Sequence, residues 1–301
     1  MDNHVMQTLA LMFLPIIIFS IKPALSQNSP AIAKPNCAAA CGGVSIPYPF
    51  GTTENCYQHS SFLVTCNETF SPPQLFLGES TMQIKNINLD GQVRVTNVYI
   101  GHDCYDRKAR RVSRVTTSLT LPYFLTVNNT ANKITVVGCD AYVYVSGRRL
   151  SREFLAGCTA VCYDKGDLEE GSCTGSGCCQ TYIPEGVWSL EIDLRSYWNY
   201  TNVWDFNDCG YAFVAETTAF NFSYESLTSL RNVTALPMVI DWAIGNGTCE
   251  EAVKNGTDYA CLSPNSTCYK PENGDGYRCR CPVGYQGNPY LIDGCYGMLV
   301  L

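Results

Sequence analysis

Cysteine constrains the fold of this chain more than any other residue type. The 301-residue sequence contains 18 cysteines, an even number and several times the average usage. This density is typical of proteins that fold in an oxidising compartment and are held together by disulfide bonds. The cysteines form two even sets, twelve between Cys37 and Cys209 and six between Cys249 and Cys295. Each set can close its own bridges, and the 39 cysteine-free residues between them predict a domain boundary.

The first 26 residues agree with such a compartment. Leu9 to Ile21 is a short apolar run, and the small residues of Ala24-Leu25-Ser26 follow it, as in a secretory signal peptide cleaved after Ser26. The alternative is an uncleaved membrane anchor, but a run of about 13 residues is shorter than the roughly 20 that span a bilayer. We expect residues 1–26 to be a signal peptide, no transmembrane segment to follow, and the product to be secreted and extracellular.

Eight Asn-x-Ser/Thr triplets are consistent with secretion, and five of them crowd between Asn221 and Asn265. Because glycans must lie on the surface, we expect this stretch to be exposed and residues 233–248 to be a glycosylated linker. The expected glycosylation sites are Asn67, Asn128, Asn199, Asn221, Asn232, Asn246, Asn255 and Asn265.

The first cysteine set surrounds short segments with strand patterns. Alternation of polar and apolar residues, or enrichment in β-branched and aromatic residues, predicts strands over 92–99, 133–137, 141–145 and 188–194. Helical signals are few, and we expect single helical turns over 150–156 and 226–231. Residues 27–232 are therefore predicted to form a mainly β, disulfide-rich domain, in which each bridge adds about 2–4 kcal/mol.

The second set has a more specific spacing, Cys249-x11-Cys261-x6-Cys268-x10-Cys279-x-Cys281-x13-Cys295. One residue separates Cys279 from Cys281, so both lie on one face of a strand. The spacing resembles that of an EGF-like module, over residues 249–295, with a short tail at 296–301. The resemblance implies the bridges Cys249–Cys268, Cys261–Cys279 and Cys281–Cys295.

Many EGF-like modules bind calcium through hard oxygen ligands near the first cysteine. Here Ile-Gly-Asn-Gly-Thr precedes Cys249, without the acidic motif of that family. Lys270 stands where those modules carry a hydroxylated Asp or Asn. We therefore expect no metal and no cofactor, and a structural role for this module.

A third motif begins the mature chain, where residues 37–51 read Cys-x3-Cys-Gly-Gly-Val-Ser-Ile-Pro-Tyr-Pro-Phe-Gly. The two prolines hold the backbone extended, so that Tyr48 and Phe50 project as rigid aromatic side chains. This run resembles the start of the galacturonan-binding domain of plant wall-associated receptor kinases. Further matches follow in order: Gly138-Cys139, Gly157-Cys158-x3-Cys162, Gly177-Cys178-Cys179 and Trp204-x-Phe206-x2-Cys209-Gly210-Tyr211-Ala212-Phe213.

The resemblance spans roughly Asn36 to Cys295, because the EGF-like module also follows in that family. Most of the matching residues are cysteine, glycine, proline and aromatics, which identify a scaffold and not a binding surface. The vicinal Cys178 and Cys179 are either a redox pair or, as we expect from the strain of a vicinal ring, bridged to other cysteines.

The resemblance implies non-enzymatic recognition of pectin, meaning de-esterified galacturonan or its oligomers, in the cell wall. Full-length members continue into a transmembrane helix and a cytosolic kinase, and they reside in the plasma membrane. The kinase signatures are missing from this sequence, so we expect no enzyme. An alternative is a secreted decoy or co-receptor that pairs with full-length receptor kinases through protein contacts.

Other chemistries have less support. A net charge of −7 disfavours nucleic acid as a partner. His59 and His102 lack a catalytic context, and oxidised cysteines offer no thiolate to zinc. The acidic residues Asp164, Asp167, Glu169 and Glu170 would suit a glycosidase only at a suitable separation, and we expect them to be solvated loop charges instead.

An acidic protein needs a local basic patch to hold a polyuronate. Two basic clusters exist: Arg107, Lys108, Arg110, Arg111 and Arg114, and then Arg148, Arg149 and Arg152. Arginine pairs bidentately with carboxylates, so both clusters are candidate ligand-binding residues. If they end neighbouring strands they line one groove; the alternative is solvated turns. Tyr48 and Phe50 are further candidates, which either stack on sugar faces or fill the core.

Overall fold

The computed structural model describes residues 31–98, 100–256 and 259–298. The expected signal peptide, residues 1–26, and the end of the expected tail, residues 299–301, lie outside these residues. The described chain is mainly β-structure closed by nine disulfides, as the cysteine pattern and the strand signals predict.

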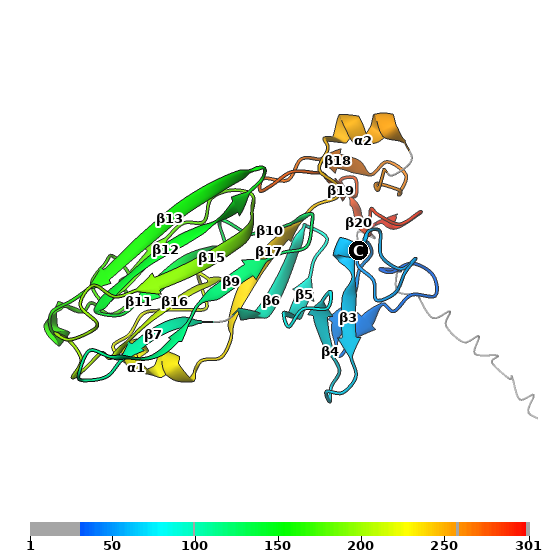
Figure 1. Cartoon of the computed structure of the whole chain (residues 1–301). Coiled ribbons are helices and arrows are strands. Elements are labelled where there is room, and N and C mark those ends of the chain that lie inside the picture. Colours follow the sequence, from blue (N-terminus) through cyan, green and yellow to red (C-terminus); the bar gives the residue numbers. More distant parts are fainter. Residues whose placement is uncertain (1–30, 99, 257–258, 299–301) are drawn as a thin grey trace, which may run out of the picture.

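Three antiparallel sheets form most of the molecule (Figure 1). The six-stranded sheet has the order β10 (Leu125–Val127), β17 (Leu236–Trp242), β6 (Gln92–Val98), β5 (Gln83–Ile87), β4 (Gln74–Leu77) and β3 (Val64–Asn67). The five-stranded sheet has the order β14 (Cys178–Thr181), β11 (Asn132–Val137), β16 (Cys209–Glu216), β7 (Gly101–Tyr105) and β8 (Arg111–Val115). The four-stranded sheet has the order β13 (Arg152–Val161), β12 (Asp140–Arg149), β15 (Val187–Arg195) and β9 (Thr117–Thr120).

The remaining elements are short. They are the strand pairs β1 (Ala40–Cys41) with β2 (Val44–Ser45), β18 (Thr267–Tyr269) with β19 (Arg278–Arg280) and β20 (Tyr285–Gly287) with β21 (Cys295–Gly297), the helices α1 (Ser226–Ser229) and α2 (Cys249–Asn255), and the 3-10 turns η1 (Ser60–Phe62), η2 (Lys165–Asp167) and η3 (Leu230–Asn232).

Within the described residues, each predicted strand segment is a strand in the structure, and the turn over 226–231 is α1 followed by η3. Residue 99, the last of the predicted strand 92–99, lies outside the described residues. The helical turn expected over 150–156 is wrong. Leu150 and Ser151 form a two-residue turn, and Arg152 opens β13, which pairs with β12 from Arg149↔Arg152 onwards. Pairing along ten residues satisfies the backbone of this segment, and it outweighs the local preference for helix.

The core follows from strand alternation. Val143, Val145 and Ile192 face inward from the four-stranded sheet and belong to the same buried cluster as Val136 and Val214 of the five-stranded sheet. The opposite face of the five-stranded sheet is covered by a second cluster around Tyr211 and Phe213. The central strands β11 and β16 of this sheet are therefore buried on both faces, whereas its edge strand β8 is exposed.

The motif over residues 37–51 contributes to the core. Tyr48 and Phe50 are only 5% and 1% exposed, and the Phe50 ring lies edge-on to Trp242 at 5.5 Å between centroids. The proposal that these two rings stack on a ligand is therefore wrong, and its alternative, core filling, is what the structure shows. Their apolar area is removed from water, which contributes about 1.5–3 kcal/mol for a fully buried ring.

The structure corrects the expected linker over 233–248. Leu236–Trp242 is strand β17, which lies between β10 and β6 and is almost entirely buried. Sheet pairing on both sides holds this segment in place without a disulfide of its own. Asp241 interrupts its apolar run, but the Asp241 carboxylate is buried and accepts hydrogen bonds from Asn128 and Asn273.

The six C-terminal cysteines pair as Cys249–Cys268, Cys261–Cys279 and Cys281–Cys295, which is the pairing that the EGF-like resemblance implies. In the first set, the vicinal Cys178 and Cys179 bridge to Cys173 and Cys158. The full set in that domain is Cys37–Cys56, Cys41–Cys66, Cys104–Cys209, Cys139–Cys162, Cys158–Cys179 and Cys173–Cys178.

The C-terminal module packs against the first domain through buried polar contacts. Arg278 donates from Nε to the Trp242 carbonyl at 2.6 Å and from an η-nitrogen to the Asp90 carbonyl at 3.0 Å. The Asn288 amide donates to the carbonyls of Ile32 and Tyr48, each at 2.8 Å. These bonds fix the module next to the six-stranded sheet, where Figure 1 shows it.

Asn128 does not suit the glycosylation that its triplet suggests. It is buried, and its amide nitrogen, the atom that would carry a glycan, donates to Asp241 at 2.9 Å. The asparagines of the other seven triplets are at least partly exposed.

We therefore expect peptide mass spectrometry of the secreted protein to find Asn128 unmodified, because a glycan there would prevent this packing. Asn199, Asn232 and Asn265, which are exposed, serve as controls in the same digest. A folded product with a glycan on Asn128 would contradict this packing.

Candidate functional site

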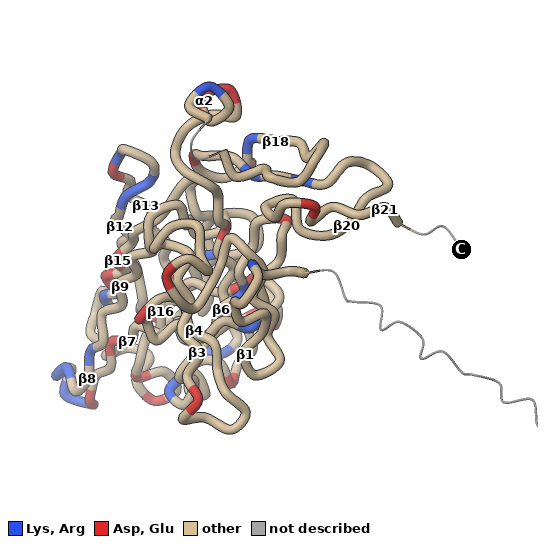
Figure 2. The backbone as a smooth tube through the Cα atoms, turned by 90° about the vertical axis from the view of Figure 1, so that its right-hand side faces the viewer, with Lys and Arg blue, Asp and Glu red and all other residues tan. Residues whose placement is uncertain are grey.

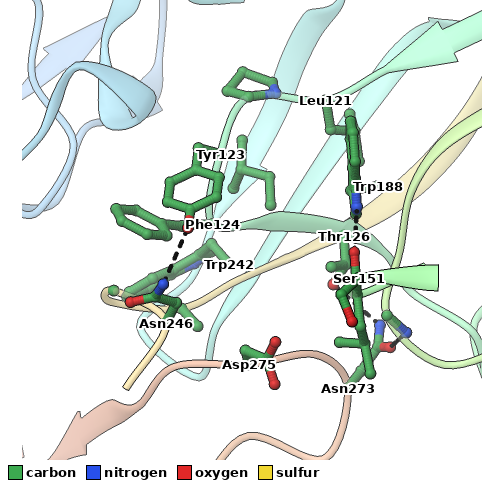
Figure 3. A pocket seen from close by; sticks show the side chains of 16 residues that line it. Leu121, Tyr123, Phe124, Thr126, Ser151, Trp188, Trp242, Asn246, Asn273 and Asp275 are labelled. Atoms are coloured by element: carbon green, nitrogen blue, oxygen red, sulfur yellow. Dashed lines mark hydrogen bonds between the residues drawn. The ribbon is translucent and has the colours of Figure 1, made fainter. Parts of the chain in front are cut away.

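A pocket of about 420 Å³ lies where the first domain meets the EGF-like module. Five segments line it: the loop between β9 and β10, the β12–β13 turn, the start of β15, the residues after β17, and the β18–β19 loop of the module. Its aromatic lining is Tyr123, Phe124, Trp188 and Trp242, and its polar lining includes Thr126, Ser151, Asn246, Asn273 and Asp275. Figure 3 shows Tyr123, Phe124 and Trp242 grouped together, with Trp188 across the pocket from them.

The N-terminal motif supports one wall of the pocket from behind. Trp242 is packed edge-on against both Phe50 and Phe62, with centroids 5.5 and 6.0 Å away. Phe124 is 6.4 Å from Phe62 and 5.0 Å from the His59 ring. Residues that do not line the pocket thus fix the orientation of two aromatic rings that do.

Two lining residues adopt a backbone conformation that bulky side chains rarely take. Phe124 has φ = 72° and Leu150 has φ = 49°. Opposite Leu150 stands Gly186, where a Cβ would come within 2.6 Å of the leucine side chain. Trp188 donates from Nε1 to the Leu150 carbonyl at 3.0 Å. Left-handed non-glycine residues cost free energy and cluster at ligand-binding sites, where the surroundings hold them.

A buried amide network forms the deep polar side of the pocket. Asn273 accepts a hydrogen bond from the Gly186 backbone at 2.7 Å and donates to Asp241 at 2.7 Å and to the Val127 carbonyl at 3.0 Å. Burial raises the pKa of the Asp241 carboxyl, against the opposing effect of its amide donors and of Arg278. The β18–β19 loop is thereby locked onto the first domain, so the pocket has fixed walls.

Three of the candidate arginines surround the turn that lines the pocket. Leu150 and Ser151 belong to the lining, and Arg149 and Arg152 flank them directly. Arg148 lies with its guanidinium 6.0 Å from the centroid of the Trp188 ring. None of the three arginines has a carboxylate of a described residue within ion-pair distance.

The other basic cluster lies elsewhere and is largely neutralised. It occupies β8 and the turn before it, at the far end of the sheets from the β12–β13 turn (Figure 2). Its ion pairs are Arg107–Asp205 at 3.0 Å, Arg110–Asp106 at 2.6 Å, Arg111–Asp103 at 2.7 Å and Arg114–Asp193 at 2.6 Å. Only Lys108 makes no ion pair with a described residue.

The expectation that both clusters line one groove is therefore wrong. Arg148 pairs in register with Ser189 near the start of β15, whereas Arg114 reaches Asp193 near the end of that strand. The β7–β8 hairpin belongs to the five-stranded sheet and the β12–β13 hairpin to the four-stranded sheet, and Figure 2 shows their turns at opposite ends of the molecule.

The acidic loop and the histidines have local structural roles. Asp164 and Asp167 form a capping box around η2, and Glu170 accepts a hydrogen bond from the Tyr224 backbone at 2.8 Å. His59 caps η1, and His102 lies 2.7 Å from the Ser113 hydroxyl.

Among the residues that the structure describes, no helix has the length and apolar character needed to cross a membrane.

Comparison with known proteins finds similarity to wall-associated receptor kinases. Residues 37–97 match the protein family described as wall-associated receptor kinase galacturonan-binding. Three similar curated proteins are wall-associated receptor kinases 2, 5 and 1 of Arabidopsis thaliana, at 38%, 36% and 34% identity. The matches cover 86%, 94% and 94% of this chain but 34%, 37% and 37% of the relatives, so the chain spans about a third of their length. No solved structure matches the chain.

Proposed function

The chain is homologous to the ectodomains of wall-associated receptor kinases and carries their galacturonan-binding domain at residues 37–97, and we propose that it binds acidic cell-wall polysaccharide. The ligand is de-esterified galacturonan or its oligomers, and binding involves no catalysis by this chain. We further propose that residues 1–26 direct it to the cell exterior, and that residues 249–295 act as a module that completes the pocket.

The observation that carries this proposal is the position of three arginines, without an ion-pair partner among the described residues, next to an aromatic-lined pocket. Segment 37–97 by itself is poorly equipped to attract a polyanion. Its basic residues are Lys85 and Arg94, against Glu54, Glu68, Glu79 and Asp90. Arg94 is also paired with Glu216 at 2.7 Å. The charge for a uronate must therefore come from outside the matched segment, and the β12–β13 turn supplies it.

The chemistry of the two parts is complementary to a galacturonate unit. The guanidinium groups of Arg149 and Arg152 offer paired N–H donors to a carboxylate. Trp188 and Tyr123 offer ring faces to the apolar C–H face of a pyranose, and such rings carry a large apolar area with a polar end. In this proposal the N-terminal motif acts indirectly, because its Phe50, together with Phe62 of the following segment, holds Trp242 in the pocket wall.

Isothermal titration of the oxidised chain with oligogalacturonide, at two salt concentrations, tests this function. We expect binding that weakens as salt increases, since exposed charges are screened over about 10 Å at 0.1 M. Fully methyl-esterified oligomers of equal length are the control, and they should bind much more weakly because they lack the carboxylate. The proposal would be contradicted if both oligomers bound with equal affinity, or if a folded sample bound no oligogalacturonide.

Glycosylation of Asn246 is predicted to reduce ligand access to this pocket. The Asn246 amide nitrogen donates to the Tyr123 hydroxyl at 3.1 Å, on the side of the pocket opposite Trp188 (Figure 3). A glycan on that nitrogen would replace this bond and obstruct the opening. We expect Asn246→Gln, expressed in glycosylating cells, to bind oligogalacturonide more tightly than the parent.

Asn232→Gln is the matched control, because Asn232 is an exposed triplet asparagine outside the pocket lining. Changing Thr248 instead would confound the result, since Thr248 caps helix α2. An unchanged affinity in Asn246→Gln, with the parent shown to be glycosylated there, would contradict the prediction.

A further inference from the structure

A second surface of the first domain carries exposed aromatic side chains. Tyr142 and Tyr144 of β12 and Tyr197 and Trp198 of the loop after β15 form a continuous group, which we call the aromatic platform. Neighbouring ring centroids are 5.5 Å (Tyr142–Tyr144), 4.4 Å (Tyr142–Tyr197) and 5.3 Å (Tyr197–Trp198) apart. Tyr144, Tyr197 and Trp198 are 49%, 47% and 46% exposed. Contiguous exposed apolar groups of this kind mark binding surfaces.

The platform is held rigidly. The buried carboxylate of Asp140 accepts hydrogen bonds from the backbone N–H groups of Tyr197 (2.9 Å), Trp198 (3.0 Å) and Tyr200 (2.7 Å). The Tyr197 hydroxyl lies 3.2 Å from the Thr159 hydroxyl. A ligand that stacks on these rings would not have to order them first, which lowers the entropic cost of binding.

The charges around the platform are paired. Asp193 lies 2.6 Å from both Arg114 and Arg195, and the Arg195 guanidinium is 6.0 Å from the centroid of the Tyr144 ring. This differs from the pocket, whose three arginines have no such partners among the described residues. The platform thus offers flat rings, tyrosine hydroxyls and two guanidinium groups that share one carboxylate, which is a smaller excess of positive charge than at the pocket.

We propose that the aromatic platform binds a neutral pyranose chain, as a second carbohydrate surface distinct from the pocket. The C–H faces of successive sugars pack on the rings, whose spacing is comparable to the length of one sugar unit. Sugar hydroxyls exchange hydrogen bonds with Arg195, Asp193 and the tyrosine hydroxyls. The platform lies at the start of β12 and the end of β15, whereas the pocket lies at the opposite ends of the same strands.

The test uses the full chain with Asn199→Asp, which removes the triplet beside Trp198. Aspartate tolerates the left-handed backbone of that position, where φ is 53°. The probes are cellohexaose and xylohexaose, titrated at two salt concentrations. We expect saturable binding of at least one of them, independent of salt, and unchanged by Arg149→Ala/Arg152→Ala.

Removing a platform ring should weaken that binding by about tenfold or more, equivalent to about 1.4 kcal/mol. Trp198→Ala is the first variant, and Tyr144→Ala is the second in case the loop of Trp198 fails to fold. Tyr285→Ala is the matched control, because Tyr285 is 50% exposed and lies in strand β20 of the EGF-like module, away from the platform.

Three outcomes would overturn the proposal. The first is that a folded sample binds neither neutral oligosaccharide. The second is that binding survives both Trp198→Ala and Tyr144→Ala. The third is that the chain self-associates and that removal of a platform ring abolishes this association. The last result would identify the platform as a contact between two copies of the protein. None of these outcomes bears on the acidic ligand of the pocket, which is recognised by salt-sensitive binding.

Discussion

Replacement of Asp241 by alanine should reduce the free energy of unfolding by about 3 kcal/mol or more, because it leaves buried polar groups without partners. The carboxylate accepts hydrogen bonds from Asn128 at 2.9 Å and from Asn273 at 2.7 Å, and it lies 3.8 Å from Arg278. These groups come from the first domain and from the EGF-like module. Equilibrium unfolding of the oxidised chain in urea, monitored by tryptophan fluorescence, should show this decrease in the free energy of unfolding.

Asp205→Ala is the control for this loss. Asp205 pairs with Arg107 at 3.0 Å, but both side chains are largely exposed. Exposed ion pairs contribute little, so its free energy of unfolding should stay close to that of the parent. If the two variants were equally stable, the network would not be what joins the module to the first domain.

The triple variant Arg148→Ala/Arg149→Ala/Arg152→Ala should bind oligogalacturonide at least about 100-fold more weakly than the parent. Hydrogen bonds to charged groups contribute about 1.5–3 kcal/mol each, and losing two of them exceeds the 2.8 kcal/mol of a 100-fold change. The salt dependence that remains should also be smaller, because fewer charges face the ligand. Titration calorimetry measures both quantities.

Arg107→Ala/Arg110→Ala is the matched control in the other basic cluster. Both arginines are already paired with aspartates, at 3.0 and 2.6 Å, so their removal should change the affinity only slightly. A larger loss in this control than in the triple variant would place the site at β8 and contradict the assignment to the pocket.

The sequence carries the fold class because cysteine spacing and strand alternation are local signals. Gln92–Val98 and Val187–Arg195 alternate as half-buried strands must, and the Cys279-x-Cys281 spacing indicates the EGF-like module. The position of β17 is not readable in this way. Leu236–Trp242 is a short apolar run between glycosylation triplets, and only its pairing with β6 and β10 distinguishes a central strand from a linker.

The site was predictable only in part. Bidentate chemistry marks both basic clusters as candidates from the sequence and does not distinguish them. Asp205 lies 98 positions from Arg107 and Asp193 lies 79 positions from Arg114, so these ion pairs are visible only in the fold. Tyr123 and Trp188 were missed as pocket residues. A tyrosine directly after Pro122, between two strand patterns, is the one local signal that could have marked an exposed loop aromatic.

The most direct test of the central claim is a crystal structure of the oxidised chain with a short oligogalacturonide. The account predicts that the sugar lies over Trp188 and Tyr123, with a carboxylate within hydrogen-bond distance of Arg149 or Arg152. Density for the ligand on the faces of β3 to β6, or against the β8 hairpin, with the pocket empty, would contradict it.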